Sequence, residues 1–497
     1  MISFLLQLLL LAPALLLSAG SDAETPRRTP IGVSAETQTC IDCHETYTPG
    51  IVADWRASRH ASTSPDQGLS KPEPERRVSA ASVPSQLQGN IVGCYECHTL
   101  NGEKHKDNFD HFGVKINIVV SPGDCKTCHP TEAAQYDAGK KAHALENLQR
   151  NPVFHTLVET ALRTRTLLGG SVASGPVLNN TKNQTCYACH GTNIEVQGTR
   201  SIASDAGDIL VPRLTNWPNH GVGRANPDGT SGSCTACHPR HNFSIEVARK
   251  PYTCGQCHLE PDVPAYNVFK ESKHGNIYES MEKNWTWDAV PWTLGKDFTA
   301  PTCAACHTST VVTPSGTMLA ERSHDFGART WVRIFGLIYS HPQPKSGKTF
   351  EIRNADGLPL PISFAGKPAH LYLITKEDQL KRQGMMKKIC SGCHGSSFIE
   401  GHFTIFDSTL VDTDAMTLAA TQLLTKAWDK KMADKTNPFD ESIEQLWVRQ
   451  WLFYANSIRY GSAMAGPDYA AFKNGRWELT TNLQDLYELI TLEKKRK

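Results

Sequence analysis

The sequence lacks an excess of charge of either sign. Its 51 lysines and arginines nearly balance 50 aspartates and glutamates, which leaves a net charge of +1 with histidine counted as neutral. A nucleic-acid-binding protein would show a basic face, so we expect no nucleic-acid partner. Disordered chains combine few hydrophobic residues with a high net charge, and here hydrophobic residues make up 39% of the chain. A folded protein is therefore expected.

Long apolar runs are also scarce. One run, over residues 4–17, is shorter than the roughly 20 residues of a membrane-spanning helix, and small residues follow it. This pattern predicts a signal peptide over residues 1–23, with an uncleaved anchor as the alternative. We expect an exported protein, in the periplasm or an equivalent compartment, with no transmembrane anchor in the mature chain. A G-x-G-x-x-G motif for a nicotinamide or flavin cofactor is missing too.

Cysteine, in contrast, is abundant and occurs in one pattern only. All 16 cysteines fall into C-x-x-C-H motifs, in which two thioethers attach a c-type haem and the histidine binds its iron. Disulfides, zinc sites and redox dithiols also use paired cysteines, but none of them requires a histidine directly after the second cysteine. The sequence therefore predicts eight covalently bound c-type haems. The motifs are Cys40-Cys43-His44, Cys94-Cys97-His98, Cys125-Cys128-His129, Cys186-Cys189-His190, Cys234-Cys237-His238, Cys254-Cys257-His258, Cys303-Cys306-His307 and Cys390-Cys393-His394.

Twelve further histidines are candidates for the second axial position of these irons. Five of them follow a motif histidine by 13 to 17 residues, which suggests a repeated unit of haem loop, short helix and distal ligand for a neighbouring haem. These five are His60, His111, His143, His274 and His324. His241, three residues after His238, suits a different haem. If every iron has two histidines the protein is an electron carrier, whereas a catalytic haem needs an open position. The histidine count permits either.

The fold class predicted from these patterns is mainly α, a multihaem cytochrome with little regular β structure. Residues 24–400 would form the haem-binding domain. Within it, residues 345–366 alternate in the manner of a β-hairpin, and Pro359 and Pro361 suggest an edge strand.

Residues 401–497 carry no haem motif and predict a C-terminal domain of long helices. One helix is expected over residues 412–434 and another over about residues 483–493. Between them, Asp440 is expected to cap a helix with an apolar stripe. The stripe consists of Ile443, Trp447, Trp451, Tyr454 and Ile458.

The phrase WPNHGVGRANPDGTSGSCTACHPRH, residues 217–241, together with the motifs, resembles the hydroxylamine oxidoreductase family of octahaem cytochromes. The phrases NPVFHTLVET, CYACHGT, ESKHG and RSHDFGAR support the likeness, which runs from about residue 36 to the C-terminus. The resemblance implies that the fourth haem, on Cys186 and Cys189, is catalytic and lacks a distal protein ligand. It implies seven distal ligands: His60, His111, His143, His155, His241, His274 and His324.

The resemblance also implies a pocket at the fourth haem, where His220 and Asp208 take protons and Tyr278 is a third residue. In hydroxylamine-oxidising members a tyrosine from a neighbouring subunit is cross-linked to this haem, and Tyr469 is the candidate here, with Tyr460 behind it. The implied function is oxidation of hydroxylamine or hydrazine by a homotrimer that passes electrons to a cytochrome partner. Members without the cross-link tend to reduce nitrite or nitric oxide, which is one alternative. A non-catalytic octahaem electron carrier is the other.

Overall fold

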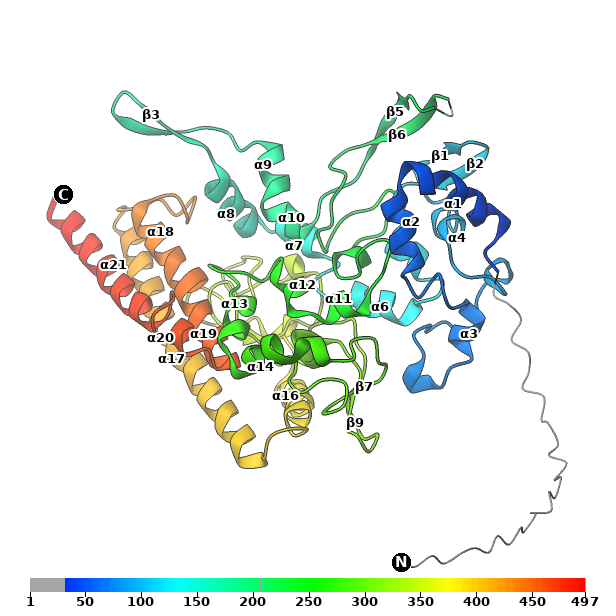
Figure 1. Ribbon diagram of the computed structural model, residues 1–497. Coiled ribbons are helices and arrows are strands. Elements are labelled where there is room, and N and C mark those ends of the chain that lie inside the picture. The colour runs from blue at the N-terminus through cyan, green and yellow to red at the C-terminus, as the bar shows by residue number, and fades with distance from the viewer. Residues whose placement is uncertain (1–31, 206, 497) are drawn as a thin grey trace, which may run out of the picture.

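The computed structural model describes residues 32–205 and 207–496, so the predicted signal peptide lies outside the described residues. The described chain is mainly helical with a few small sheets, which confirms the predicted fold class. The N-terminal and C-terminal helices lie on opposite sides of the molecule, with the haem-motif segments between them (Figure 1). No helix of the described part of the chain has both the length and the apolar character needed to cross a membrane.

A single helical turn presents several of the C-x-x-C-H motifs. Helices α4 (Cys94–His98), α10 (Cys186–His190) and α15 (Cys303–His307) each begin at the first cysteine and end at the histidine. Residues i, i+3 and i+4 share one face of a helix. Both sulfurs and the imidazole of a motif therefore point the same way.

Short helices joined by loops make up the rest of the N-terminal and central regions. Several begin at a proline, whose fixed φ angle suits the first helical turn. They are α1 (Ala35–Tyr47), α2 (Pro49–Arg56), α3 (Pro65–Leu69), α5 (Pro122–Cys125), α6 (Pro130–Ala138), α7 (Ala144–Gln149), α8 (Pro152–Leu162), α9 (Asn179–Gln184), α11 (Ile245–Arg249), α12 (Pro251–Gly255), α13 (Ala265–Glu271) and α14 (Lys273–Met281).

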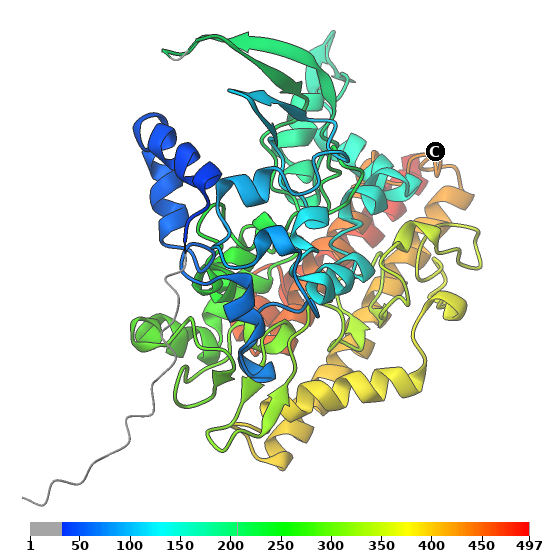
Figure 2. The same ribbon diagram turned by 90° about the vertical axis from the view of Figure 1, so that its right-hand side faces the viewer.

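Three antiparallel hairpins project from this region. They are β1 (Asn108–His111) with β2 (Val114–Asn117), β3 (Arg165–Leu168) with β4 (Ser171–Ser174), and β5 (Val196–Ile202) with β6 (Ile209–Leu214). Gly169 and Gly170 both have positive φ angles and form the two-residue turn between β3 and β4. In Figure 2 the β1–β2 and β5–β6 hairpins extend next to each other at one end of the molecule. Further short strands are β7 (Trp292–Thr293), β8 (Val311–Val312), β9 (Met318–Ala320), β10 (Val332–Arg333) and β11 (His341–Pro342).

The predicted hairpin over residues 345–366 is wrong. This segment contains the 3₁₀ helix Thr349–Glu351 and turns, with one isolated bridge between Ile362 and Pro368. The backbone N–H groups of residues 356 and 358 donate to the side-chain Oδ1 of Asn354. These two N–H groups are therefore not available for hydrogen bonds between strands. Pro359 and Pro361 have no N–H to donate, so a regular ladder cannot form there.

The C-terminal region is a group of long helices, as predicted. They are α16 (Lys376–Cys390), α17 (Ser396–Asp429), α18 (Ser442–Val448), α19 (Ala455–Met464), α20 (Pro467–Ala471) and α21 (Arg476–Arg496), with a π-helical segment Arg449–Tyr454 between α18 and α19. Helix α17 begins well before the predicted residue 412 and crosses the predicted domain boundary at residue 400.

Four of the five residues of the predicted apolar stripe are buried, with Ile443, Trp447, Trp451 and Ile458 all at 2% exposure or less, whereas Tyr454 is only partly buried. These side chains recur mostly every four residues. Because an α-helix has 3.6 residues per turn, side chains at this spacing shift gradually around its surface. The wider π-helical turn counters the drift and keeps the stripe on one face.

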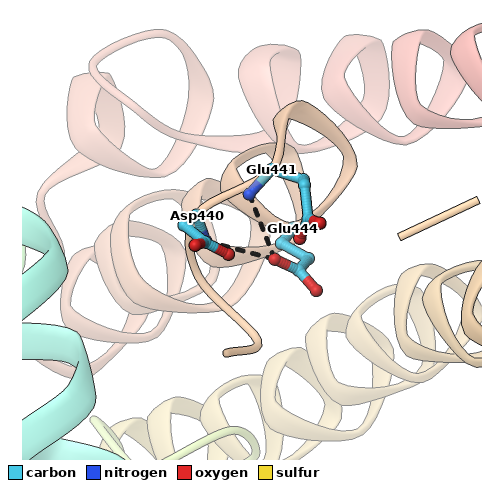
Figure 3. A group of neighbouring side chains, drawn as sticks. All are labelled: Asp440, Glu441 and Glu444. Atoms are coloured by element: carbon cyan, nitrogen blue, oxygen red, sulfur yellow. Dashed lines mark hydrogen bonds between the residues drawn. The ribbon is translucent and has the colours of Figure 1, made fainter. Parts of the chain in front are cut away.

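The start of α18 carries three neighbouring acidic residues, Asp440, Glu441 and Glu444 (Figure 3). Glu441, not Asp440 as predicted, is the N-cap residue. The buried Glu444 Oε2 accepts from the backbone N–H groups of Asp440 and Glu441, both at 3.1 Å, and its Oε1 accepts from Trp428 Nε1 at 2.7 Å. The cluster thus satisfies the free N–H groups at the helix start.

Candidate functional site

One continuous cavity of about 2080 Å³ runs between the N-terminal, central and C-terminal segments. An ordinary ligand pocket occupies roughly 300–1000 Å³, so this space is several times larger. Cysteines from seven of the eight motifs line it, and so do six of the motif histidines. The lining histidines are His129, His190, His238, His258, His307 and His394.

The motif histidines are oriented for metal binding. In four of them Nδ1 faces a backbone carbonyl oxygen, which can only accept, so Nδ1 carries the proton and Nε2 keeps its lone pair for a metal. The contacts are His98 with Asn117 O at 2.7 Å, His129 with Arg77 O at 3.1 Å, His190 with Ala144 O at 3.3 Å and His307 with Phe326 O at 3.3 Å.

Three predicted distal histidines stand opposite a motif histidine of another segment. Metal–nitrogen bonds of about 2 Å on either side of one ion hold two imidazole centroids roughly 6 Å apart. The observed centroid distances fit this spacing: 6.1 Å for His44 and His111, 6.4 Å for His60 and His129, and 6.1 Å for His274 and His394.

Two more predicted distal histidines lie near enough to a motif histidine for its charge to affect their pKa. Burial first, and then the nearby His98, lower the pKa of His241. Burial and the nearby His238 lower the pKa of His324 to about 4. The structure thus places three of the seven predicted distal histidines opposite a motif histidine, and two more within the electrostatic influence of one.

His143 and His155 are placed differently. His143 Nε2 lies 2.8 Å from the carbonyl oxygen of Asp137. The side chain of His155 is half-exposed, lies 3.8 Å from Glu159 and does not line the cavity. Their roles as distal ligands stay predictions.

Positively charged side chains that face the cavity are suited to pair with the propionate carboxylates of bound haems. The Nε of Arg333 is buried and has no hydrogen-bond partner among the described residues. Burial, and then the nearby Arg333, lower the pKa of Lys140 to about 8, and its Nζ donates to a neutral group, Gln343 Oε1, at 2.8 Å. Buried charge is costly without a counter-charge, which an anionic cofactor would supply.

Cysteines of different motifs lie near enough to shift one another's pKa. These interactions relate the first motif to the second, the third to the fifth, the fourth to the sixth, and the sixth to the seventh. The pairs are Cys40 with Cys94, Cys125 with Cys234, Cys189 with Cys257, and Cys254 with Cys303. Haems attached at paired motifs would be neighbours, and the fourth motif is related in this way to the sixth and, through it, to the seventh.

The loop 219–224 packs directly on the fourth motif. Asn219 Nδ2 donates to Tyr187 O at 3.1 Å, and the backbone N–H groups of residues 222 and 223 donate to the carbonyl oxygens of Cys189 and His190 at 2.9 and 3.1 Å. This loop carries His220, which lines the cavity.

Two glycines allow this close packing. A Cβ on Gly221 would lie 2.2 Å from the backbone nitrogen of Gly191, which itself has a φ of +102°. We expect Gly221→Ala to displace His220 and to weaken the binding of cyanide or nitrite by roughly 10–100-fold, because misplacement by about 1 Å has effects of this size.

The measurement is an optical ligand titration of the haem-loaded protein. Gly50→Ala is the matched control, since a Cβ at Gly50 would meet nothing within 4 Å. Unchanged ligand affinity in Gly221→Ala would contradict the role of the loop.

The surroundings of His220 are cationic. Arg240 Nη2 lies 3.0 Å from His220 Nδ1. The guanidinium carbons of Arg240 and Arg224 lie 4.7 and 5.4 Å from the ring centroid of Trp217. Burial, Arg240 and Arg224 all lower the pKa of His220.

The other predicted pocket residues lie elsewhere. Asp208 is exposed between β5 and β6, on the hairpin that projects outward in Figure 1, and does not line the cavity. Tyr278 packs among aromatic rings, with centroids 5.8 Å from Trp285 and 6.2 Å from Trp287, also off the cavity. Within this chain the structure does not bring Asp208 or Tyr278 to the fourth motif.

Tyr469 is buried within its own chain at 2% exposure. Its hydroxyl donates to Glu260 Oε2 at 2.6 Å. Tyr460 does line the cavity, with its ring 6.2 Å from that of Phe335. Within the single chain, the hydroxyl of Tyr469 is thus engaged by Glu260.

Sequence reasoning missed Arg224, Arg240 and Asp262. Asp262 lines the cavity, and burial raises its pKa. Both arginines fall inside the phrase of residues 217–241, next to glycine or histidine. The available signal was a pair of arginines in a segment otherwise poor in charge.

Comparisons with known proteins support a multihaem cytochrome c. The family model described as "Seven times multi-haem cytochrome CxxCH" matches residues 226–313, and "Cytochrome c554 and c-prime" matches residues 39–114 and 124–208. A solved hypothetical multihaem protein is 44% identical, with a TM-score of 0.87 over 93% of this chain and 96% of that one.

Two proteins of Kuenenia stuttgartiensis are also similar. A probable nitrite reductase-hydroxylamine oxidoreductase fusion protein is 25% identical over 72% of this chain, which spans only 34% of that relative. The reducing HAO-like protein complex shares the fold, with 18% identity and a TM-score of 0.60 over 93% of this chain and 87% of that one.

Proposed function

Because this chain belongs to the hydroxylamine oxidoreductase-like family of multihaem cytochromes c, we propose that it is an oxidoreductase acting on small nitrogen compounds at the fourth haem. The observation that carries the proposal is the packing of loop 219–224 on the motif of Cys186, Cys189 and His190, which places His220 on the cavity beside it. Eight haems would be bound, one at each motif. His60, His111, His241, His274 and His324 would be distal ligands, and His143 and His155 would complete the set after local rearrangement.

When bound at Cys186, Cys189 and His190, a haem would supply an iron able to bind a nitrogen compound and exchange electrons with it. The chain's own residues do the rest. His190 is held by Ala144 O with its Nε2 free, and His220 reaches the cavity with a hydrogen bond from Arg240. Electrons would pass between the fourth and sixth motifs, whose cysteines Cys189 and Cys257 are neighbours, and would be exchanged with a cytochrome partner.

We favour the reductive direction, with nitrite or nitric oxide as substrate, over hydroxylamine or hydrazine oxidation. The oxidative branch depends on a tyrosine offered to a neighbouring subunit, and the Tyr469 hydroxyl is instead bound to Glu260 inside its own chain. An exported homotrimer stays part of the proposal on the sequence arguments.

The test is turnover of nitrite and of hydroxylamine by purified haem-loaded protein, with a chemically reduced or oxidised dye as electron partner. His220→Asn is expected to lower kcat by roughly 10²–10⁴-fold, the usual effect of removing a positioned proton-transfer group. His370→Asn, at an exposed histidine, is the control. Absence of turnover with every nitrogen compound, together with no binding of nitrite or cyanide, would leave only an electron carrier.

A further inference from the structure

Three buried carboxylates belong to the segments that pack at the second motif. Glu96 stands between Cys94 and Cys97 of the motif itself, whereas Asp107 and Asp124 follow the motif in the chain. The three acidic residues are only 7%, 0% and 3% exposed. Buried carboxylates are rare in proteins because a charge loses its hydration on burial. Their position at a single haem site therefore points to a role in that site.

A chain of hydrogen bonds connects Asp107 with the histidine of this motif. Asp107 Oδ2 accepts from the backbone N–H of Val119 at 2.7 Å, and the carbonyl oxygen of Val119 accepts from Asn117 Nδ2 at 3.1 Å. The carbonyl oxygen of Asn117 in turn lies 2.7 Å from His98 Nδ1. Asn117 and Val119 are both fully buried, so this connection runs through the protein interior and not through solvent.

Asp124 lies near a cysteine of the same motif. Burial first, and then the charges of Glu96 and Asp124, raise the pKa of the Cys97 thiol to about 12. Asp124 Oδ1 also accepts at 2.9 Å from the side-chain Nδ2 of Asn101, which stands three residues after the motif histidine. A haem attached at Cys97 would therefore have Glu96 and Asp124 among its neighbours.

Hydrogen bonds keep these carboxylates ionised in the interior. Asp124 accepts from the backbone N–H of Ser121 at 2.8 Å and from His105 Nε2 at 3.2 Å. Burial alone would raise the pKa of Asp124, but its hydrogen bonds lower it. Glu96 Oε2 accepts from Thr37 Oγ1 at 2.7 Å and from a backbone N–H group at 2.8 Å. A buried carboxylate that accepts two or three such bonds stays charged.

One positive charge faces these three negative charges. The ring nitrogens of His105 lie 3.1 Å from Asp107 and 3.2 Å from Asp124, so both carry protons and the imidazole is a cation. In the part of the chain that the structure describes, no lysine or arginine lies within salt-bridge distance of Glu96, Asp107 or Asp124. An excess of negative charge is therefore buried at the second motif. The propionates of bound haems would add to it, so the sign of the local charge does not depend on them.

We propose that Glu96, Asp107 and Asp124 hold the second haem at a low reduction potential, so that it passes electrons on to neighbouring haems instead of retaining them. Reduction adds one electron to a haem, and nearby negative charges oppose this addition because the protein interior screens them poorly. The proposal goes beyond the function proposed above and applies to either direction of the reaction at the fourth haem. Its failure would therefore leave that function untouched.

The experiment is a redox titration of haem-loaded protein at pH 7, followed by optical and electron paramagnetic resonance spectra. Asp107→Asn, which keeps the shape of the side chain and removes its charge, should raise the potential of one haem in eight. At a fixed applied potential, the ratio of reduced to oxidised haem should rise by roughly tenfold, which corresponds to about 59 mV for one electron. Glu96→Gln and Asp124→Asn should raise the potential of the same haem.

Glu103→Gln is the matched control, because Glu103 is an exposed carboxylate two residues before His105 and solvent screens its charge. The haem that responds should also be among the last to be reduced in the unaltered protein. If one variant fails to load its haems, the other two decide, since each removes a different charge. Unchanged potentials in the loaded variants, an equal shift in Glu103→Gln, or loss of the second haem from all three variants would overturn the proposal.

Discussion

Replacing His105 with leucine is expected to lower the free energy of unfolding by about 3–5 kcal/mol, the usual cost of removing one partner from a buried ion pair. His105 Nδ1 lies 3.1 Å from Asp107 Oδ1, and its Nε2 lies 3.2 Å from the carboxylate of Asp124. All three side chains are at most 2% exposed. Both ring nitrogens face carboxylates, so the imidazole is a cation, and its loss would leave two buried carboxylates without a counter-charge.

The effect should reach the second motif. Asp107 Oδ2 also accepts from the backbone N–H of Val119 at 2.7 Å, and this segment contains Asn117 O, which accepts from His98 Nδ1. Denaturant unfolding of haem-loaded protein measures the change, with the exposed His370→Leu as control. Stability within about 0.5 kcal/mol of the unaltered protein would contradict a charged triad.

The stability difference between the unaltered protein and His105→Leu is also expected to depend on pH. Burial alone would lower the pKa of His105, but hydrogen bonds to Asp107 and Asp124 outweigh it and raise the pKa to about 10. Its unfolded value is about 6.5. The stabilisation is therefore complete below about pH 6.5 and is lost as the pH rises toward 10. The unaltered protein should lose stability across this range, and His105→Leu should lose distinctly less.

Replacing His60 with glycine is expected to convert one low-spin haem per chain into a high-spin haem. His60 lies opposite His129 at a centroid distance of 6.4 Å, and burial lowers its pKa to about 4, which leaves the imidazole neutral and able to bind iron. Removing one of two axial histidines opens a coordination position on that iron.

Electron paramagnetic resonance of the oxidised protein gives the number of high-spin haems. His274→Gly should behave in the same way, because His274 faces His394. His370→Gly is the control on an exposed histidine without a motif partner in the predicted ligand set. An unchanged spectrum for His60→Gly would remove His60 from the ligand set.

The haem sites could be predicted because their information is local. Two cysteines and a histidine within five residues share one helical face, and the distal histidines recur at a nearly constant distance from the motifs. The contact between Arg240 and His220 could not be predicted in this way. The two residues are twenty positions apart and meet only when the intervening chain folds back. The position of Asp208 depends on the β5–β6 hairpin, which pairs with a bulge and carries the residue away from the loop of His220.

The errors in the fold have equally specific causes. The hairpin expected over residues 345–366 fails because the side chain of Asn354 takes over the backbone hydrogen bonds. The β3–β4 hairpin, which sequence reasoning missed, has apolar Leu167, Leu168 and Val172 exposed, so it shows no alternation between an apolar and a polar face. Its one available signal was the Gly169-Gly170 pair.

The cavity takes its walls from segments near both ends of the described chain, from Ala57 to Ala465. An interior of this kind closes around its cofactors, so covalent attachment has to reach the cysteines while the chain is still open. A molecule that leaves maturation with one haem missing has a void among its packed walls, and voids in a packed interior cost stability. We therefore expect protein that lacks one haem to unfold at a lower temperature than fully loaded protein.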